Sequence, residues 1–201
     1  TIAPATPKPR TMSRGAAEAL TTDIKALSRE LLEHRIASHT ARSTRYNLEK
    51  GFNYVVPSLL EADRELKKSF REAMEIYRKQ YAKLYDQMIS RGFSEEEARE
   101  VARYLLPMAA HTCYVWTVNA RSLINFLGLR LCVRASPEMR ELAMKIHRIV
   151  AKVYPEIFKE IGCRGYNQGL CPENENRPST CPYLKLIPTK KEAERARKPG
   201  G

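Results

Sequence analysis

Apolar residues recur every three, four or seven positions through the middle of the chain, which is the period of one face of an α-helix. Charged residues fill the positions between them. The stripe consists of Leu59, Leu66, Phe70, Met74, Tyr77, Tyr81, Leu84 and Met88. Pro57 and Ser58 precede it, and Gly92 follows where a left-handed glycine would end a helix. The sequence therefore predicts that the longest helix lies between Pro57 and Gly92.

Four other segments carry helical signals. They are residues 22–35, capped by Thr22 or Asp23; residues 94–107, which open on the Ser94–Glu97 capping box; residues 119–130; and residues 136–162, which open on Ser136-Pro137 and are interrupted by Pro155. Residues 38–56 differ, because aromatic and β-branched residues in Gly51–Val56 favour a loop with one or two short strands. The predicted fold class is α+β, predominantly helical, with a reduced β element.

The domain organisation follows from composition along the 201 residues. Residues 1–21 are proline-rich and predict an extended or disordered arm, residues 22–162 a single domain, and residues 163–201 an irregular, basic, cysteine-containing tail. Neither a bilayer-spanning apolar run nor a signal peptide is recognisable, so we expect no membrane association and a cytoplasmic location. Because the chain begins with Thr1, we expect the first residues to be missing, cut off or part of a longer polypeptide.

The formal net charge is +12, which favours anionic partners such as nucleotides, nucleic acid or acidic lipid headgroups. Charge alone does not choose among these classes. Much of the excess lies near the two ends, around residues 8–10 and 190–198. A basic nucleic-acid-binding protein therefore stays open as an alternative.

The five cysteines are an odd number in a chain with no secretory signal, so reduced thiols are expected. Cys163, Cys171 and Cys181 are separated by eight and ten positions, unlike the tight pairs of zinc sites, even with His147 considered as a further ligand. We expect free thiols or one redox-labile pair there, and no metal. Cys113 and Cys132 lie in apolar sequence and are expected to be small core residues.

Residues 119–130 combine a leucine-rich face with polar residues at helical spacing. Arg121 and Asn125 are four apart and share one face, while Asn119 and Arg130 are about three turns apart on another stripe. A helix buried on its leucine face would hold two amides and two guanidiniums in fixed directions. A second polar cluster lies upstream, between residues 34 and 46.

These two clusters resemble the flavin-dependent thymidylate synthases. The residues that carry the resemblance are Arg103-Tyr-Leu-Leu-Pro107, Trp116-Thr-Val-Asn119-Ala-Arg121-Ser-Leu-Ile-Asn125-Phe-Leu-Gly-Leu-Arg130 and His34-Arg35-x-x-Ser38-x-x-x-x-Ser43-x-Arg45-Tyr46, together with the spacing of the three tail cysteines. The likeness covers roughly residues 22–181. It implies a homotetramer, or a hetero-oligomer with a related domain, whose active sites combine residues of more than one subunit.

The resemblance also implies an activity and a set of site residues. Members methylate dUMP at C5, using FAD, methylenetetrahydrofolate and NADPH. The residues implied to contact FAD are His34, Arg35, Asn119, Arg121 and Asn125. Those implied to hold dUMP are Ser43, Arg45, Arg103 and Arg130, and Arg130 is also the implied catalytic residue.

Elementary chemistry is consistent with these roles. C5 of a neutral uracil is a poor nucleophile, and a fixed guanidinium beside the developing ring anion would stabilise charge that forms on the way to reaction. Planar guanidiniums such as those of Arg45 and Arg103 also suit a phosphate dianion. Asparagine offers both a donor and an acceptor to a flavin edge or a ribityl hydroxyl.

The chain departs from the family pattern at four positions. Glu33 replaces an arginine, Thr40 and Ala41 replace an Asn-Glu pair, and Glu30 replaces a glutamine used for dUMP. Where an anion lies beside this position, the change from a cation to Glu33 turns attraction into repulsion. At a distance of about 4 Å and an effective dielectric near 20, the difference in interaction energy is roughly several kcal/mol. Two hypotheses within the family follow: a synthase whose site another subunit or domain completes, and a catalytically reduced relative acting as a scaffold or nucleotide-binding partner.

Overall fold

The computed structural model describes residues 25–197. Its α-helices are α2 (Lys25–Leu32), α3 (Arg64–Ser90), α4 (Glu95–Ala102), α5 (Ala120–Arg130), α6 (Pro137–Val153), α7 (Pro155–Phe158), α8 (Arg164–Gln168) and α9 (Lys190–Arg197). Its strands are β1 (Ala37–Ala41) and β2 (Tyr114–Val118), and its 3-10 helices are Ser58–Leu60, Arg103–Leu105 and Asn174–Asn176. The described residues do not include the expected arm at residues 1–21, the predicted caps Thr22 and Asp23, or Ile24. The predicted class, predominantly helical α+β with a small sheet, is confirmed.

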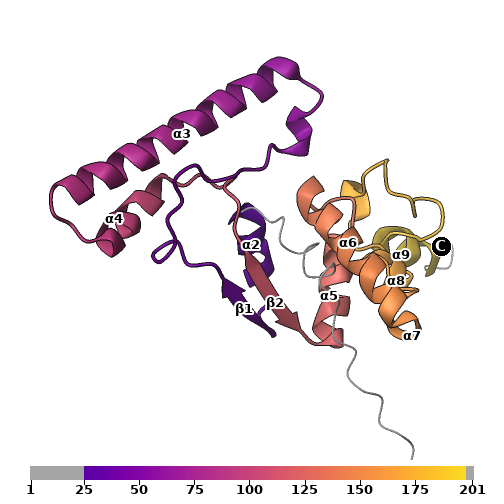
Figure 1. Ribbon diagram of the computed structural model, residues 1–201. Coiled ribbons are helices and arrows are strands. Elements are labelled where there is room, and N and C mark those ends of the chain that lie inside the picture. Colours follow the sequence, from indigo (N-terminus) through magenta and orange to yellow (C-terminus); the bar gives the residue numbers. More distant parts are fainter. Residues whose placement is uncertain (1–24, 198–201) are drawn as a thin grey trace, which may run out of the picture.

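The elements form two groups joined by a small sheet (Figure 1). The α3–α4 hairpin extends to one side, helices α5–α9 lie on the other, and α2 with the two strands lies between them. The larger core lies where α2 and β2 pack against the second group, and it contains residues of α2, β2, α5, α6 and α7. Its buried members are Leu27, Leu31, Tyr114, Leu123, Phe126, Leu127, Met139, Leu142, Ala143, Ile146 and Phe158.

The long helix begins later than predicted. A 3-10 turn at Ser58–Leu60 comes first, and α3 then starts at Arg64 because the Asp63 carboxylate accepts hydrogen bonds from the amides of Glu65 and Leu66. The predicted end at Gly92 is confirmed by its φ of +86°. Phe93 N–H donates to the Met88 carbonyl, as expected of a left-handed helix end.

Burial along α3 follows the predicted stripe only in part, since Met74 and Tyr81 are buried while Tyr77 is exposed. Tyr81 and Tyr85 pack against Ala98 and Ala102 of α4 and form a second core cluster. Leu66 is 54% exposed, because the eight-residue α4 covers only the carboxyl-terminal part of the 27-residue α3 (Figure 1). The predicted Ser94–Glu97 capping box, which fixes the start of α4, is present.

The sheet consists of β1 and β2 in antiparallel register, with Ser38 opposite Thr117 and His39 opposite Trp116. The first strand lies in the segment predicted to contain one. The expected strand at Gly51–Val56 is wrong: only Tyr54 forms a bridge, to Ala110. No strand is predicted at Tyr114–Val118, where the structure has β2.

Two other local predictions are corrected. Cys113 is exposed rather than in the core, since it precedes β2 at the edge where its carbonyl accepts the Arg42 amide. The segment after residue 162 contains the short helices α8 and α9 where only irregular structure was expected.

The predicted break at Pro155 is confirmed, because α6 ends at Val153 and α7 begins at Pro155. Over residues 25–197, none of the helices has the length and apolar character needed to cross a bilayer.

Candidate active site

A ring cluster joins β2, α5 and the turn before β1. The His34 side chain is buried, with its ring 5.0 Å from that of Phe126 and 6.2 Å from that of Trp116, both in edge-on arrangements. The Trp116 and Phe126 rings are 4.9 Å apart. The Nε2 atom of His34 and the Nε1 atom of Trp116 are buried with no hydrogen-bond partner among the described residues. Such orphaned polar atoms are costly unless a ligand or water satisfies them.

His39 beside this cluster has a defined tautomer. Its Nε2 lies 3.2 Å from the carbonyl oxygen of His34, and its Nδ1 lies 2.6 Å from the Tyr114 hydroxyl oxygen. A carbonyl only accepts, so Nε2 must donate, and in the neutral ring Nδ1 then accepts the tyrosine proton. His39 thereby fixes the backbone that carries His34.

Burial lowers the pKa of His34 below its ordinary value, and the positive charge of Arg130 lowers it further, while Glu33 opposes the shift. The folded protein therefore binds a proton at His34 less readily than the unfolded chain does. The contribution of neutral His34 to the free energy of unfolding is fully present above the unfolded pKa of about 6.5. It is lost as the pH falls through the folded pKa. We expect the free energy of unfolding to fall between pH 7.5 and pH 5, with part of that fall absent in His34→Gln.

Urea denaturation followed by fluorescence of Trp116, the only tryptophan, measures this effect. His111→Gln is the matched control, because His111 is exposed. A His34→Gln protein with the same pH dependence as the wild type would contradict the assignment of the acid-sensitive step to His34.

Arg130, the predicted catalytic residue, lies at the end of α5 and is partly buried, with 22% of its side chain exposed. Its Nη1 is 3.0 Å from Oε2 of Glu30 in α2, while its Nε is buried without a partner in the described chain. Phe126, whose ring contacts that of His34, is one helical turn before Arg130, and the charge of Arg130 contributes to the lowered pKa of His34. Sequence reasoning missed that Glu30 would pair with Arg130.

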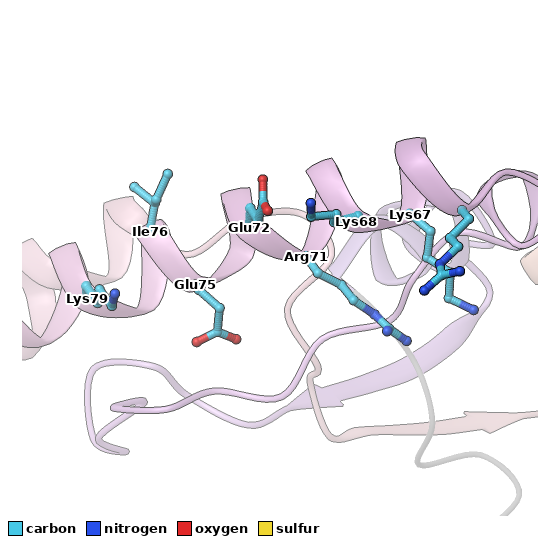
Figure 2. Close-up of a pocket in the computed structure, with 8 residues that line it drawn as sticks. Lys67, Lys68, Arg71, Glu72, Glu75, Ile76 and Lys79 are labelled. Carbon is cyan, nitrogen blue, oxygen red and sulfur yellow. The ribbon is translucent and has the colours of Figure 1, made fainter.

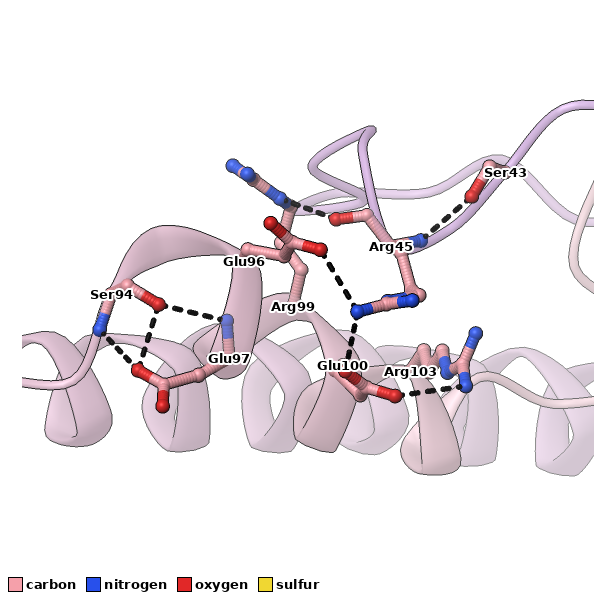
Figure 3. Close-up of polar contacts among 8 residues, drawn as sticks. All are labelled: Ser43, Arg45, Ser94, Glu96, Glu97, Arg99, Glu100 and Arg103. Atoms are coloured by element: carbon pink, nitrogen blue, oxygen red, sulfur yellow. Dashed lines mark hydrogen bonds and ion pairs between the residues drawn. The ribbon is translucent and has the colours of Figure 1, made fainter.

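Arg45 and Arg103 form a second group, in the loop that faces α4 and in the 3-10 helix that follows α4 (Figure 3). Arg45 Nη2 lies 2.9 Å from a carboxylate oxygen of Glu96 and 3.2 Å from one of Glu100. Arg103 Nη2 lies 3.6 Å from the other oxygen of Glu100. Ser43 is exposed and accepts a hydrogen bond from the Arg45 amide at 3.3 Å.

This second group brings together three of the four predicted dUMP-binding residues. Glu96 and Glu100 are four positions apart, so the sequence could have shown that they share a helix face. It could not have shown that an arginine 51 positions earlier lies against that face. The ion pairs are partly exposed and keep the guanidiniums of Arg45 and Arg103 close together.

The predicted flavin contacts of α5 lie at the start of the helix and on one exposed face of it. Asn119 caps the helix, with its side-chain oxygen accepting the Ser122 amide at 2.9 Å. Arg121 and Asn125 are exposed, and Arg164 of α8 lies 3.5 Å from the Asn125 oxygen. Arg121 is nine positions before Arg130, so the two lie about 180° apart around the helix.

An apolar groove of about 490 Å³ adjoins Asn119 on the side of the sheet and α6. Its lining includes Trp116, Val118, Leu123, Ile146, Val150 and Phe158. Grooves of this size with a few polar groups at the rim are typical of sites for small ligands.

The predicted residues thus fall into three places within one chain. The first contains His34 and Arg130, on either side of Phe126. The second contains Ser43, Arg45 and Arg103, and the third contains Asn119, Arg121 and Asn125 of the α5 segment. Arg35 is exposed, as is Glu33, and no described contact connects Arg35 with the other predicted flavin residues. Thr40 and Ala41, which replace the family's Asn-Glu pair, are exposed at the end of β1.

The cysteines have an arrangement that spacing did not predict. Cys132, Cys163, Cys171 and Cys181 all line one void of about 90 Å³ between the end of α5 and the tail. All are free thiols, and no group of three possible ligands is close enough for a metal in the part of the chain that the structure describes. His147 is elsewhere, with Nε2 lying 2.8 Å from the Phe158 carbonyl oxygen.

The basic face of α3 is the main candidate for nucleic-acid binding. Arg64, Lys67, Lys68, Arg71 and Lys79 line a shallow surface hollow (Figure 2). Glu72 and Glu75 lie on the same surface, and Lys67 forms an ion pair with Glu61. Mixed charge of this kind is typical of a solvated helix face and does not favour binding to a phosphate backbone.

Comparison with known proteins gives a consistent result. Residues 19–156 match the family model described as thymidylate synthase complementing protein, Thy1. The chain is 40% identical over 157 residues to a flavin-dependent thymidylate synthase of Clostridium tetani, covering 74% of this chain and 63% of that protein. It is 38% identical over 167 residues to the enzyme of the same name from Pyrococcus abyssi, covering 78% and 64% respectively. The chain therefore spans less than two thirds of the length of these relatives.

Proposed function

The chain belongs to the Thy1 family of thymidylate synthase complementing proteins, and on that premise we propose that it methylates dUMP reductively to dTMP. FAD is the proposed cofactor, with methylenetetrahydrofolate and NADPH as co-substrates. The observation that carries this proposal is that His34 and Arg130 each have a buried nitrogen with no partner among the described residues, and that Phe126, one helical turn before Arg130, contacts the His34 ring. A site built for a ligand has such unsatisfied donors when the ligand is absent.

The proposed cofactor fits the residues present. Arg121 and Asn125 offer a guanidinium and an amide on one exposed face of α5, and Asn119 offers an amide at the start of the helix, next to an apolar groove that suits a planar ring. The side-chain oxygen of Asn119 already caps α5, which leaves its amide NH₂ group for a flavin acceptor. When bound and reduced by NADPH, the flavin would pass the reducing equivalents on to the reaction. His34 and Arg35 are the proposed additional contacts.

The proposed role of Arg130 is electrostatic. Its guanidinium would lie beside uracil and stabilise negative charge as N3 loses its proton, which increases electron density at C5. Ser43, Arg45 and Arg103 would hold the rest of the nucleotide, with the two guanidiniums suited to the phosphate. The buried aromatic rings beside His34 keep the region poor in water, where each charge interaction is stronger.

We also propose that another subunit, or a related domain, completes the site. Arg121 and Arg130 lie on opposite sides of α5, and Arg45 lies against a different helix, so one chain presents its binding groups in separate directions. Exposed apolar residues supply surface for subunit contact, among them Leu59, Ile76 and Tyr104, which are 78%, 59% and 82% exposed. The same proposal includes a homotetramer and a cytoplasmic location. It also includes the division of the chain into an arm (1–21), a domain (22–162) and a tail (163–201).

Titration of the purified protein with FAD tests this proposal. We expect quenching of flavin fluorescence with saturable binding, a further spectral change on adding dUMP, and a native mass above that of the monomer. Arg121→Ala should weaken FAD binding by about tenfold, the size expected for loss of a charged hydrogen bond. The matched control is Arg91→Ala, an exposed arginine at the end of α3.

The two rival functions predict different results from the same preparation. A scaffold would form an oligomer without binding flavin, and a nucleic-acid binder would capture DNA or RNA with an affinity that falls steeply with salt. Absence of FAD binding in the oligomeric protein would overturn the synthase proposal.

A further inference from the structure

The carboxylate of Glu30 is engaged at both oxygens. Oε2 lies 3.0 Å from Arg130 Nη1, and Oε1 accepts a hydrogen bond from the Ser136 hydroxyl at 3.3 Å. Ser136 precedes α6 but makes no capping bond with its side chain, so its hydroxyl is directed to Glu30 instead. Three elements, α2, α5 and the start of α6, therefore meet at this carboxylate.

The position of Glu30 is set by packing rather than by the ion pair alone. Leu27 and Leu31 of α2 are buried in the same core as Leu127 of α5. Glu30 is three residues after Leu27 and one before Leu31, so the leucine contacts place its side chain at the end of α5. The pairing with Arg130 is thus part of how α2 docks.

The ion pair leaves Arg130 incompletely satisfied. A carboxylate that bound the guanidinium through two parallel hydrogen bonds would use two of its nitrogen atoms. Here Nη1 contacts Glu30, while Nε is buried and has no partner among the described residues. Glu30 and Arg130 remain 34% and 22% exposed at their side chains, so the pair can separate without unfolding the core.

The charge of Glu30 opposes an anionic ligand at Arg130. A carboxylate within contact distance neutralises the guanidinium, and it repels a second anion that approaches the same group. A neutral amide at this position would leave the full positive charge of Arg130 available. Glu30 is also the position where the resemblance places a glutamine used for dUMP, so this chain has a negative charge where a neutral group would serve.

We propose that Glu30 is a latch on Arg130, holding the guanidinium in the protein alone and releasing it when an anionic pyrimidine nucleotide binds. The latch determines how tightly the site binds nucleotide. This inference rests on the proposed function for the identity of the ligand, but the masking of Arg130 by Glu30 does not depend on it.

The first arm of the test measures masking without a nucleotide. The full-length protein is treated with phenylglyoxal, which modifies free guanidiniums, and the rate at Arg130 is followed by peptide mass spectrometry. Glu30→Gln should raise that rate about three- to fivefold, the range expected from release of a partly exposed ion pair. Ser136→Ala, which removes the second contact of the carboxylate, should raise it by a smaller factor and serves if Glu30→Gln does not fold.

The matched control is Glu75→Gln, which makes the same charge change at another partly exposed pair, Glu75 with Arg78 at 2.8 Å. It should raise labelling of Arg78 and leave labelling of Arg130 unchanged. Labelling of Arg130 at equal rates in the wild type and in Glu30→Gln overturns the latch, whatever the nucleotide data show.

The second arm measures dUMP binding by calorimetry. Glu30→Gln should bind dUMP about tenfold more tightly than the wild type, and the gain should disappear in the double variant Glu30→Gln/Arg130→Ala. Equal binding by the wild type and Glu30→Gln refutes the latch and leaves the proposed function standing. If neither protein binds dUMP, the proposed function and the nucleotide part of this inference fail together, and the labelling result alone decides the masking.

Discussion

Arg130→Ala is expected to reduce dUMP-dependent oxidation of the reduced flavin by about 100-fold or more, the usual cost of removing a group that stabilises a developing anion. The alanine variant loses the guanidinium whose positive charge acts on His34 and which pairs with Glu30. The loss should fall on kcat more than on KM, because the interaction strengthens as the uracil ring becomes anionic. Stopped-flow measurement of flavin absorbance, with and without dUMP, gives the rate directly.

Two further variants separate charge from geometry. Arg130→Lys keeps the charge but not the planar fork, so it should recover only part of the rate. Arg134→Ala, which breaks the Arg134–Glu173 ion pair four residues further along, is the matched control and should leave the rate unchanged. Full turnover in Arg130→Ala would remove Arg130 from the proposed chemistry.

Phe126→Ala is expected to lower the free energy of unfolding by about 3–5 kcal/mol, the usual cost of truncating a fully buried phenylalanine. The Phe126 side chain is fully buried in the larger core and contacts the rings of both His34 and Trp116. Its removal leaves a cavity behind the site as well as in the core. Urea denaturation followed by circular dichroism measures the change, and a red shift of Trp116 emission would report the loosened ring cluster.

Phe93→Ala provides the comparison, because Phe93 is 47% exposed and lies outside both core clusters. We expect it to change stability by well under half as much as Phe126→Ala. A loss below about 1 kcal/mol in Phe126→Ala would mean that the site does not depend on this packing.

Local signals in the sequence determined most of the helices. The Ser94–Glu97 capping box, the glycine at position 92 and the proline at position 155 act through bonds and backbone geometry within a few residues. For that reason their predicted positions are confirmed. The family resemblance depends likewise on residues spaced along one helix, 119–130, and the comparisons confirm it.

Sequence reasoning failed where the deciding partner was distant along the chain. Strand β2 was missed although all five of its residues, Tyr114–Val118, are aromatic or β-branched and favour a strand; β1, the partner that makes it a strand, lies more than seventy positions earlier. Leu66 was assigned to the buried stripe by its spacing, yet it is exposed because α4 is too short to reach it. Cys132 was expected in the core by composition and instead joins the tail cysteines around one void.

The site shows the same division. The sequence by itself determined which residue types the site contains, because the polar positions of residues 34–46 and 119–130 can be recognised from spacing. Only the tertiary structure decided their partners: Glu30 on Arg130, Glu96 and Glu100 on Arg45, and aromatic rings around His34. These ion pairs and ring contacts depend on how α2 packs on α5 and on how the loop before Tyr46 lies against α4. Packing between segments that are distant along the chain leaves no repeating pattern in the sequence from which it could be predicted.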